Sequence, residues 1–213
     1  MLIKTDSTII DIGANIGYYS VMAANISKNG HVYSFEPSPQ IYGQLLLNIE
    51  ANHLLNVKTF RCAVGRREGN LPFYLSGPDN TGMSGLRAAE NYSGQTVITE
   101  VIVLDRWAAD NKMKKIDFIK MDIEGAELEA LSGMTIILEQ QQPVLFIEIR
   151  LPLLQQFDQT PDAIYQLLYG FGYSAFEIGE KLTVRKINSF PEGDSILFIP
   201  KHFHFPDEIT IVE

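Results

Sequence analysis

The alternation of two kinds of segment constrains the fold of this chain more than any other feature. From residue 8 to residue 199, short runs rich in β-branched and aromatic residues alternate with longer segments that suit helices. This pattern is typical of repeated β-α-β units around a parallel sheet. With 213 residues, 46% of them hydrophobic, the chain can bury a substantial core, and we expect one domain over residues 1–213.

Local signals place the individual elements. The predicted fold is α/β, with a mostly parallel seven-stranded sheet, helices on both faces and an antiparallel closing strand. Glycines between residues 69 and 85 break up the chain, and we expect a mobile loop or flap at residues 76–95. The predicted sheet strands are residues 8–12, 32–35, 57–64, 116–121, 144–149, 173–178 and 196–199, with a further strand at 96–103 and helices at 17–28, 38–52 and 160–170.

The strongest local signal is the segment at residues 11–17, Asp-Ile-Gly-Ala-Asn-Ile-Gly, which ends the first predicted strand and opens a helix. Gly13 and Gly17 permit positive φ angles and a close backbone approach, and a helix N-terminus offers free N–H donors to an anionic group. For S-adenosylmethionine, that anion is the methionyl carboxylate, and Asp11 could complement the ammonium group directly or through water. The alternative is an ordinary strand-to-helix turn, because short motifs carry a false-positive risk.

Glu36 strengthens the case for a nucleotide cofactor. It ends the second predicted strand about 20 residues after the glycine turn, where a carboxylate can accept hydrogen bonds from both ribose hydroxyls. A solvated surface glutamate is the alternative. A dinucleotide fingerprint needs glycines in a G-x-G-x-x-G arrangement, but Asn15 and Tyr18 occupy its second and third glycine positions, which disfavours a dehydrogenase.

Three segments together resemble the signature regions of FkbM-family methyltransferases. They are residues 11–17, residues 35–39 (Phe-Glu-Pro-Ser-Pro) and residues 116–127 (Ile-Asp-Phe-Ile-Lys-Met-Asp-Ile-Glu-Gly-Ala-Glu). The resemblance runs from residue 8 to residue 149, with weaker support to residue 172. It implies a Rossmann-like class I methyltransferase fold, S-adenosylmethionine as the methyl donor, and O-methylation of a hydroxyl on a small molecule, sugar or natural product.

The chain departs from the family pattern in two places. Asn15 stands where many class I methyltransferases have a second glycine, although FkbM-like sequences commonly tolerate this exchange. Only seven residues precede the first predicted strand, whereas family members usually carry an N-terminal extension that helps to cover the cofactor. We therefore expect an acceptor pocket that is either unusually open or completed by another subunit, which leaves a homo-oligomer as an open alternative.

The topology predicts which side chains share a site. In an open parallel sheet, ligands collect beyond the carboxyl ends of the strands, near the switch in strand order. We therefore expect the side chains that end four of the strands to face one crevice: Asp11, Glu36, Asp122 and Glu148. The residues expected to bind the cofactor are Asp11, Gly13, Asn15, Gly17, Glu36, Ala63 and Asp122.

Three carboxylates are candidates for the catalytic group that positions an alcohol acceptor and removes its proton. Asp122 directly follows a predicted strand, and N-capping of the next helix is its alternative role. Glu148 lies near the end of an apolar strand, where it must face the cleft or form an ion pair, with Arg150 as the candidate partner. Glu124 could share substrate or metal contacts with Asp122, but we expect no metal. Ser84, in a small-residue loop, is a further candidate substrate contact, with a plain surface loop as the alternative.

Composition narrows the class of partner. A formal net charge of −9 disfavours a nucleic-acid substrate, because binding to a phosphate backbone depends on Lys and Arg contacts. No stretch approaches the roughly 20 apolar residues of a spanning helix. The first residues also lack an apolar signal core, so we expect neither membrane insertion nor secretion. The single cysteine, Cys62, excludes an internal disulfide and favours a reducing, cytoplasmic compartment.

Two other hypotheses stay open. Methylation of a nitrogen is disfavoured because the Asn/Asp-Pro-Pro-aromatic motif of amino-methyltransferases is absent. A catalytically inactive methyltransferase-like binding module would hold the cofactor without turnover. The sequence does not name the acceptor, which we expect to be a small molecule or a saccharide.

Overall fold

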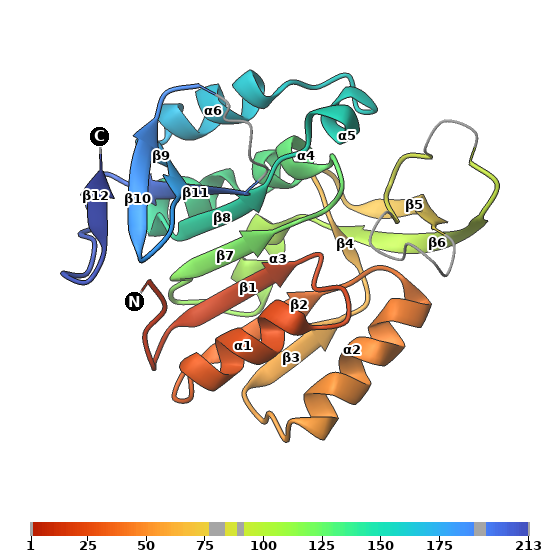
Figure 1. The fold of residues 1–213 in the computed structure, drawn as a ribbon. Helices are drawn as coiled ribbons and strands as arrows, with labels where there is room; N and C mark the ends of the chain where they lie inside the picture. The colour runs from red at the N-terminus through yellow and green to blue at the C-terminus, as the bar shows by residue number, and fades with distance from the viewer. Residues whose placement is uncertain (1, 77–83, 89–91, 190–194, 213) are drawn as a thin grey trace.

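The computed structural model describes residues 2–76, 84–88, 92–189 and 195–212. Within these residues the strands form a nine-stranded sheet in the order β12-β10-β9-β11-β8-β7-β1-β2-β3 and a three-stranded sheet in the order β4-β6-β5 (Figure 1). The strands are β1 (Thr8–Ile12), β2 (His31–Phe35), β3 (Val57–Phe60), β4 (Ala63–Val64), β5 (Gly69–Leu75), β6 (Gln95–Ile102), β7 (Phe118–Met121), β8 (Val144–Glu148), β9 (Tyr173–Ile178), β10 (Thr183–Ile187), β11 (Ser195–Pro200) and β12 (Thr210–Val212).

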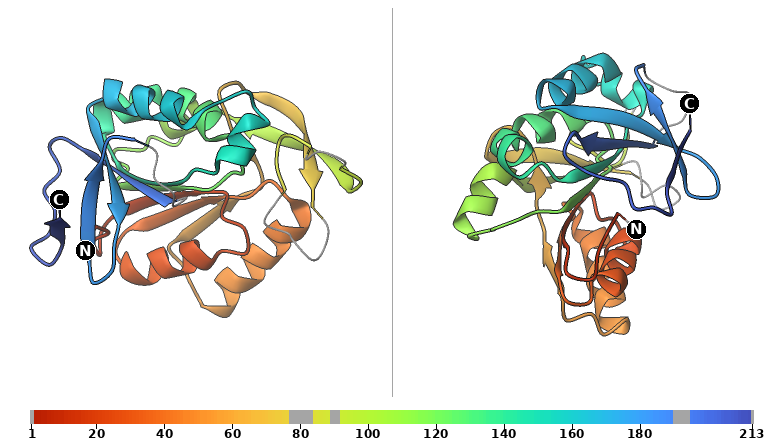
Figure 2. Two further views of the ribbon diagram at one scale, coloured as in Figure 1. Left: turned by 45° about the horizontal axis from the view of Figure 1, so that its top comes forward. Right: turned by 90° about the vertical axis from the view of Figure 1, so that its left-hand side faces the viewer.

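Helices cover both faces of the large sheet, as Figure 2 shows from the side. Apolar side chains of α1 pack on one face, and those of α3, α4 and α6 pack on the other. The second layer is the larger, since it buries most of the core. The helices are α1 (Tyr18–Ile26), α2 (Pro39–Ala51), α3 (Leu104–Asp110), α4 (Glu127–Ser132), a π-helical segment (Ile137–Gln141), α5 (Leu151–Gln155) and α6 (Pro161–Gly170).

The strands β3, β2, β1, β7 and β8 run parallel, and their carboxyl ends meet at one edge of the large sheet. The helix after β2 begins where the sequence predicts it. Ser38 caps α2 by accepting the Ile41 N–H, and Pro39 occupies the first helical position, where its missing N–H costs nothing. The predicted α/β, mostly parallel sheet with helices on both faces is confirmed.

The strand count differs from the predicted seven, because two strands extend the sheet beyond β9. β10 pairs antiparallel with β9, and β12 pairs parallel with β10. The predicted antiparallel closing strand is β11, which lies between β8 and β9 and pairs antiparallel with both. All three residues of β12 are exposed, and buried and exposed residues do not alternate regularly in β10. The apolar pattern of these segments was therefore too weak to predict strands.

The prediction of one strand over residues 57–64 was wrong. β3 follows β2 only as far as Phe60, and the chain then bends so that β4 pairs with Val101 and Ile102 of β6. β5, which was not predicted, pairs antiparallel with β6 along its whole length. Its first four residues are exposed, so burial gave no alternating signal there.

Half of the predicted flap at residues 76–95 lies outside the described residues, at 77–83 and 89–91. Its described part returns to the small sheet, since the backbones of Tyr74 and Gly85 exchange two hydrogen bonds of 2.9 and 3.1 Å. No helix in the described part of the chain is long and apolar enough to cross a membrane.

Candidate functional site

The turn after β1 is wedged between the ends of β2 and β7. Gly13 has a φ of +75° and Gly17 a φ of +92°, values that glycine adopts without strain. The N–H groups of Gly13 and Ala14 both donate to the Phe35 carbonyl, at 3.0 Å. A Cβ atom on Gly13 would lie 1.9 Å from the carbonyl oxygen of Asp122. Position 13 of the turn therefore accepts glycine only, because any side chain would collide with the Asp122 backbone.

Glu36, at the end of β2, closes the same turn from the other side. It is 6% exposed, and its two carboxylate oxygens accept the N–H groups of Asn15, at 2.9 Å, and Ser38, at 2.8 Å. Burial raises its pKa to about 7, although these two hydrogen bonds oppose the shift. Each oxygen keeps a second lone pair, so the carboxylate can still accept hydroxyl donors.

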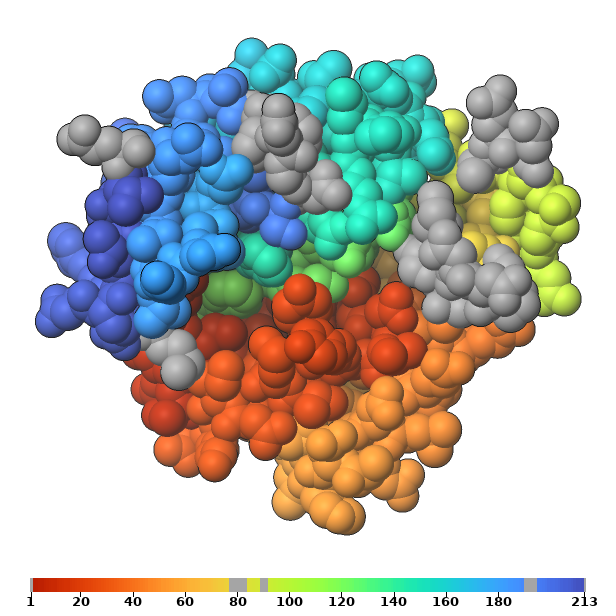
Figure 3. All heavy atoms as spheres, viewed as in Figure 1, coloured from red at the N-terminus to blue at the C-terminus, as the bar shows by residue number. Residues whose placement is uncertain are grey.

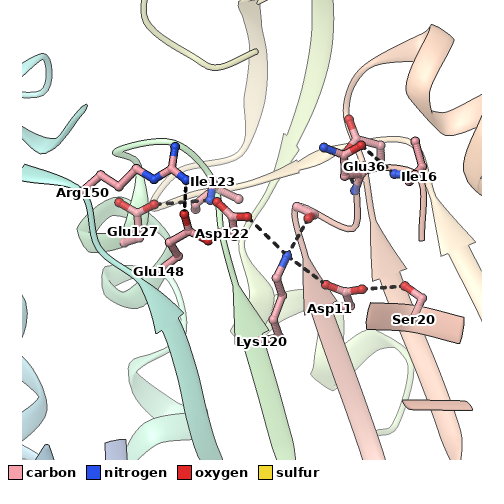
Figure 4. Close-up of polar contacts among 12 residues, drawn as sticks. Asp11, Ile16, Ser20, Glu36, Lys120, Asp122, Ile123, Glu127, Glu148 and Arg150 are labelled. Atoms are coloured by element: carbon pink, nitrogen blue, oxygen red, sulfur yellow. Dashed lines mark hydrogen bonds and ion pairs between the residues drawn. The ribbon is translucent and has the colours of Figure 1, made fainter. Parts of the chain in front are cut away.

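A buried lysine supports the turn from below, as Figure 4 shows. The Lys120 ammonium donates to the Gly13 carbonyl at 2.9 Å and lies 3.5 Å from a carboxylate oxygen of Asp11 and 3.9 Å from one of Asp122. The second Asp11 oxygen accepts the Ser20 hydroxyl at 2.6 Å. Lys120 therefore joins the turn after β1 to the carboxylate after β7.

Two carboxylates follow β7 at the mouth of the site. Asp122 has a side chain that is 31% exposed, and Glu124 adopts a φ of +55°. Burial, followed by the nearby Asp122 charge, raises the pKa of Glu124 to about 7. One Glu124 carboxylate oxygen is buried and has no hydrogen-bond partner among the described residues. This oxygen is free to accept a proton or a donor from a ligand.

Glu148, the third candidate, forms the ion pair with Arg150 that the sequence suggested, at 2.5 Å. Burial and the Asp122 charge raise the pKa of Glu148, while Arg150 opposes that rise. Glu148 is therefore electrostatically linked to Asp122 but is held by its arginine. Within the described residues, no group of three or more His, Cys, Asp or Glu side chains is arranged to hold a metal ion.

Glu127, in the first turn of α4, was not predicted as part of the site. One of its oxygens accepts the N–H groups of Gly125, at 3.1 Å, and Ile123, at 3.3 Å. Burial raises its pKa to about 7. Its contacts fix the backbone that carries Glu124.

Some of these groups line one cavity with about 630 Å³ of empty space, counting the part open to solvent. The turn after β1 and the Glu36 carboxylate both border it. Its polar lining comes from Asn15, Glu36, Ser84, Asp122 and Glu124, and its apolar lining includes Phe35, Ile41, Cys62, Ala63, Val64, Phe73 and Leu86.

Seven of the predicted site residues line this cavity: Gly13, Asn15, Glu36, Ala63, Ser84, Asp122 and Glu124. Asp11, Gly17 and Glu148 do not. Asp11 instead lines a second hollow on the α1 face of the sheet. Figure 3 shows the molecule from that face, with green atoms at the bottom of a hollow. The cofactor contacts and catalytic roles of all these residues, those that line the cavity included, stay predictions.

Comparisons with known proteins place the chain in a family. The family described as "Methyltransferase FkbM domain" matches residues 11–175. The chain belongs to the FkbM methyltransferase family. The family match covers the β1 turn, Glu36, Lys120 and all three candidate catalytic carboxylates.

Curated relatives are similar over part of their length. Methyltransferase sdnD of Sordaria araneosa is 30% identical, over 59% of this chain and 60% of that protein. The 2-O-methyltransferase NoeI of Sinorhizobium fredii is 27% identical, over 62% of this chain and 59% of that protein. The FkbM-family chain thus spans about 60% of the length of these relatives.

A solved structure supports the fold. The methyltransferase FkbM of Methylobacillus flagellatus superposes with a TM-score of 0.57 at 19% identity, over 92% of this chain and 44% of that one. At this identity the likeness concerns the fold alone. It confirms the Rossmann-like class I methyltransferase architecture predicted from the sequence.

Proposed function

We propose that this FkbM-family chain is an S-adenosylmethionine-dependent methyltransferase that methylates a hydroxyl group. One observation carries the proposal: the glycine turn after β1 and the Glu36 carboxylate line the same cavity. The name of the relative NoeI, a 2-O-methyltransferase, supports a hydroxyl acceptor.

The residues present fit the cofactor. Glu36 retains lone pairs for two ribose hydroxyls, and the bare backbone at Gly13 allows close approach of the methionyl part. An adenine ring needs an apolar pocket, and apolar side chains border the cavity beside Glu36. They come from Phe35, Ile41, Cys62, Ala63 and Val64.

When bound, S-adenosylmethionine supplies an electrophilic methyl group. The tasks left to the chain are to align the acceptor oxygen and to take its proton. Glu124 suits proton removal for two reasons. The pKa of its carboxyl group is raised to about 7, near the working pH, and one of its oxygens has no hydrogen-bond partner among the described residues. Asp122 lines the same cavity and suits positioning of the acceptor hydroxyl.

We infer that the acceptor is a saccharide or small molecule and not a nucleic acid, because the chain carries a net charge of −9. The single free cysteine fits a reducing, cytoplasmic setting. We also propose that residues 1–213 act as one domain.

The experiment is calorimetric titration of the chain with S-adenosylmethionine, followed by a radiolabel transfer assay over hydroxyl and amino acceptors. We expect saturable binding that Glu36→Gln weakens at least about tenfold, since charged hydrogen bonds contribute about 1.5–3 kcal/mol. Gly43→Ala in α2, a position with open space around it, is the matched control and keeps full affinity.

The outcomes separate the alternatives. Absence of binding at millimolar cofactor would remove the proposal. Label transfer to a base nitrogen with sugars inert would favour N-methylation. Tight cofactor binding without transfer to any acceptor would favour an inactive binding module.

A further inference from the structure

Arginine side chains divide into two groups by their partners. Of the seven arginines in the sequence, three form ion pairs with glutamates in the described structure: Arg106 with Glu68, Arg150 with Glu148, and Arg185 with Glu177. The other four form no ion pair with any residue that the structure describes: Arg61, Arg66, Arg67 and Arg87.

Three of these four arginines line one groove. The groove lies between the small sheet and the segment around α5, and Arg66, Arg67 and Arg87 border it. It holds about 1360 Å³ of empty space, counting the part open to solvent. Two glutamates also border it. Glu68 pairs with Arg106, whereas Glu129 forms no ion pair within the described residues and accepts a hydrogen bond from Gln159. Three arginines beside this one unpaired glutamate leave the groove with a surplus of positive charge, although the whole chain has a net charge of −9.

The groove adjoins the candidate catalytic cavity, because Leu86 lines both. The guanidinium of Arg87 lies over the Phe157 ring, 5.4 Å from its centre, which fixes the cation at the groove wall. Phe157 packs beside the turn that carries Glu124, since a Cβ on Gly125 would lie 3.1 Å from its ring. Phe157 therefore links Arg87 to the turn that carries Glu124.

We propose that this arginine groove, formed by Arg66, Arg67 and Arg87, binds an anionic group on the acceptor. The inference rests on the proposed function and names the acceptor class: a hydroxylated molecule, such as a sugar, that carries a carboxylate or a phosphate. Guanidinium groups match both anions with paired hydrogen bonds. Three cations without ion-pair partners in the described structure also attract an anion that the negatively charged rest of the surface repels.

The groove also offers surfaces for the neutral part of such a molecule. The rings of Phe157 and Tyr74 border it, and the side chain of Asn70 adds an amide. Planar rings and amides can contact the faces and hydroxyls of a sugar, while the arginines fix its charge. The anion then anchors the acceptor in the groove, and a hydroxyl extends past Leu86 toward Asp122 and Glu124.

The test is NMR observation of the arginine Nε–Hε signals during titration with three probes: methyl β-D-glucuronide, glucose 1-phosphate and the neutral methyl β-D-glucoside. Signals are assigned with Arg66→Gln, Arg67→Gln and Arg87→Gln. The matched control is Arg61→Gln, because Arg61 is also exposed and without an ion pair but does not line the groove. Cofactor affinity is measured on every variant by calorimetry.

We expect saturable shifts of the three groove arginines with at least one anionic probe, and none with the glucoside. Arg87→Gln should weaken that binding about tenfold or more, with cofactor affinity unchanged, and Arg61→Gln should leave both unchanged. The glucuronide and phosphate arms show which anion is preferred. Equal binding of glucoside and glucuronide, an undiminished affinity in Arg87→Gln, or no shift with either anion at millimolar concentration would overturn this inference. Loss of cofactor binding in the wild-type chain would instead overturn the proposed function.

Discussion

The ammonium group of Lys120 donates a 2.9 Å hydrogen bond to the carbonyl oxygen of Gly13. The two residues are 107 positions apart in the sequence, yet this contact ties β7 to the turn after β1. Lys120 is 6% exposed and lies between the carboxylates of Asp11 and Asp122. One buried cation therefore holds both the proposed cofactor turn and a candidate catalytic group.

Lys120→Met should destabilise the fold strongly. The change leaves Asp11, which is 1% exposed, as a buried charge without its cation, and breaking such a pair costs about 3–5 kcal/mol. Urea unfolding followed by circular dichroism measures the effect. Arg106→Gln, which breaks an exposed pair with Glu68, is the control and should cost less than about 1 kcal/mol.

A double variant tests the reason. Lys120→Met combined with Asp11→Asn removes both charges, so it should recover part of the lost stability. If the single change proves as mild as the Arg106 control, the buried ion pair does not support the turn.

Gly13→Ala should abolish cofactor binding and destabilise the chain. Its methyl group would meet the Asp122 carbonyl at 1.9 Å, and a φ of +75° is strained for alanine. Gly43→Ala, inside α2 with open space around it, should instead stabilise by about 1 kcal/mol. Thermal unfolding and cofactor titration of both variants check the pair; a Gly13→Ala protein with normal affinity would contradict the proposed cradle.

Cofactor affinity should fall as the pH drops from 8 to 6. The pKa of Glu36 is raised to about 7, and only its ionised form accepts both ribose hydroxyls, so the cofactor competes with a proton. Below the pKa the loss approaches about tenfold per pH unit. Calorimetry across this range gives the slope. Glu36→Gln should bind weakly with a flat profile, whereas Glu124→Gln should keep the slope, which assigns the titration to Glu36.

The sequence was sufficient for those parts of the fold that depend on local pattern. β1, β2 and β8 are nearly continuous apolar runs bounded by glycine or proline, and the structure places them within one residue of the predicted positions. β5 and β10 were missed because partly exposed strands are held by pairing with distant segments, which leaves little trace in their own residues.

The site shows the same division. Gly13 and Glu36 could be predicted because each ends a strand beside a turn, and parallel strands bring such ends together. The roles of Lys120 and Glu127 could not, because they depend on distances between elements far apart in the chain. A lysine inside the buried strand β7 was the one available signal, since a buried charge requires a partner.

Glu127 should make the fold less stable as the pH rises. Its pKa is about 7 in the folded chain and 4.5 as the ordinary value, so the folded state binds the proton more tightly than the unfolded state. Its contribution is complete below pH 4.5 and is lost as the pH rises through 7, a change of about 3 kcal/mol at most. The free energy of unfolding of wild type minus that of Glu127→Gln should therefore fall between pH 5 and 8. The control is Glu139→Gln, at an exposed position. The free energy of unfolding of wild type minus that of Glu139→Gln should not change between pH 5 and 8. Glu36 has a raised pKa as well, but it titrates in both proteins and cancels from the comparison. The Glu127 charge contributes to the raised pKa of Glu124, so both proteins are compared in a Glu124→Gln background. A difference that rises with pH would show that Glu127 is ionised in the folded chain, held by the N–H groups of Ile123 and Gly125.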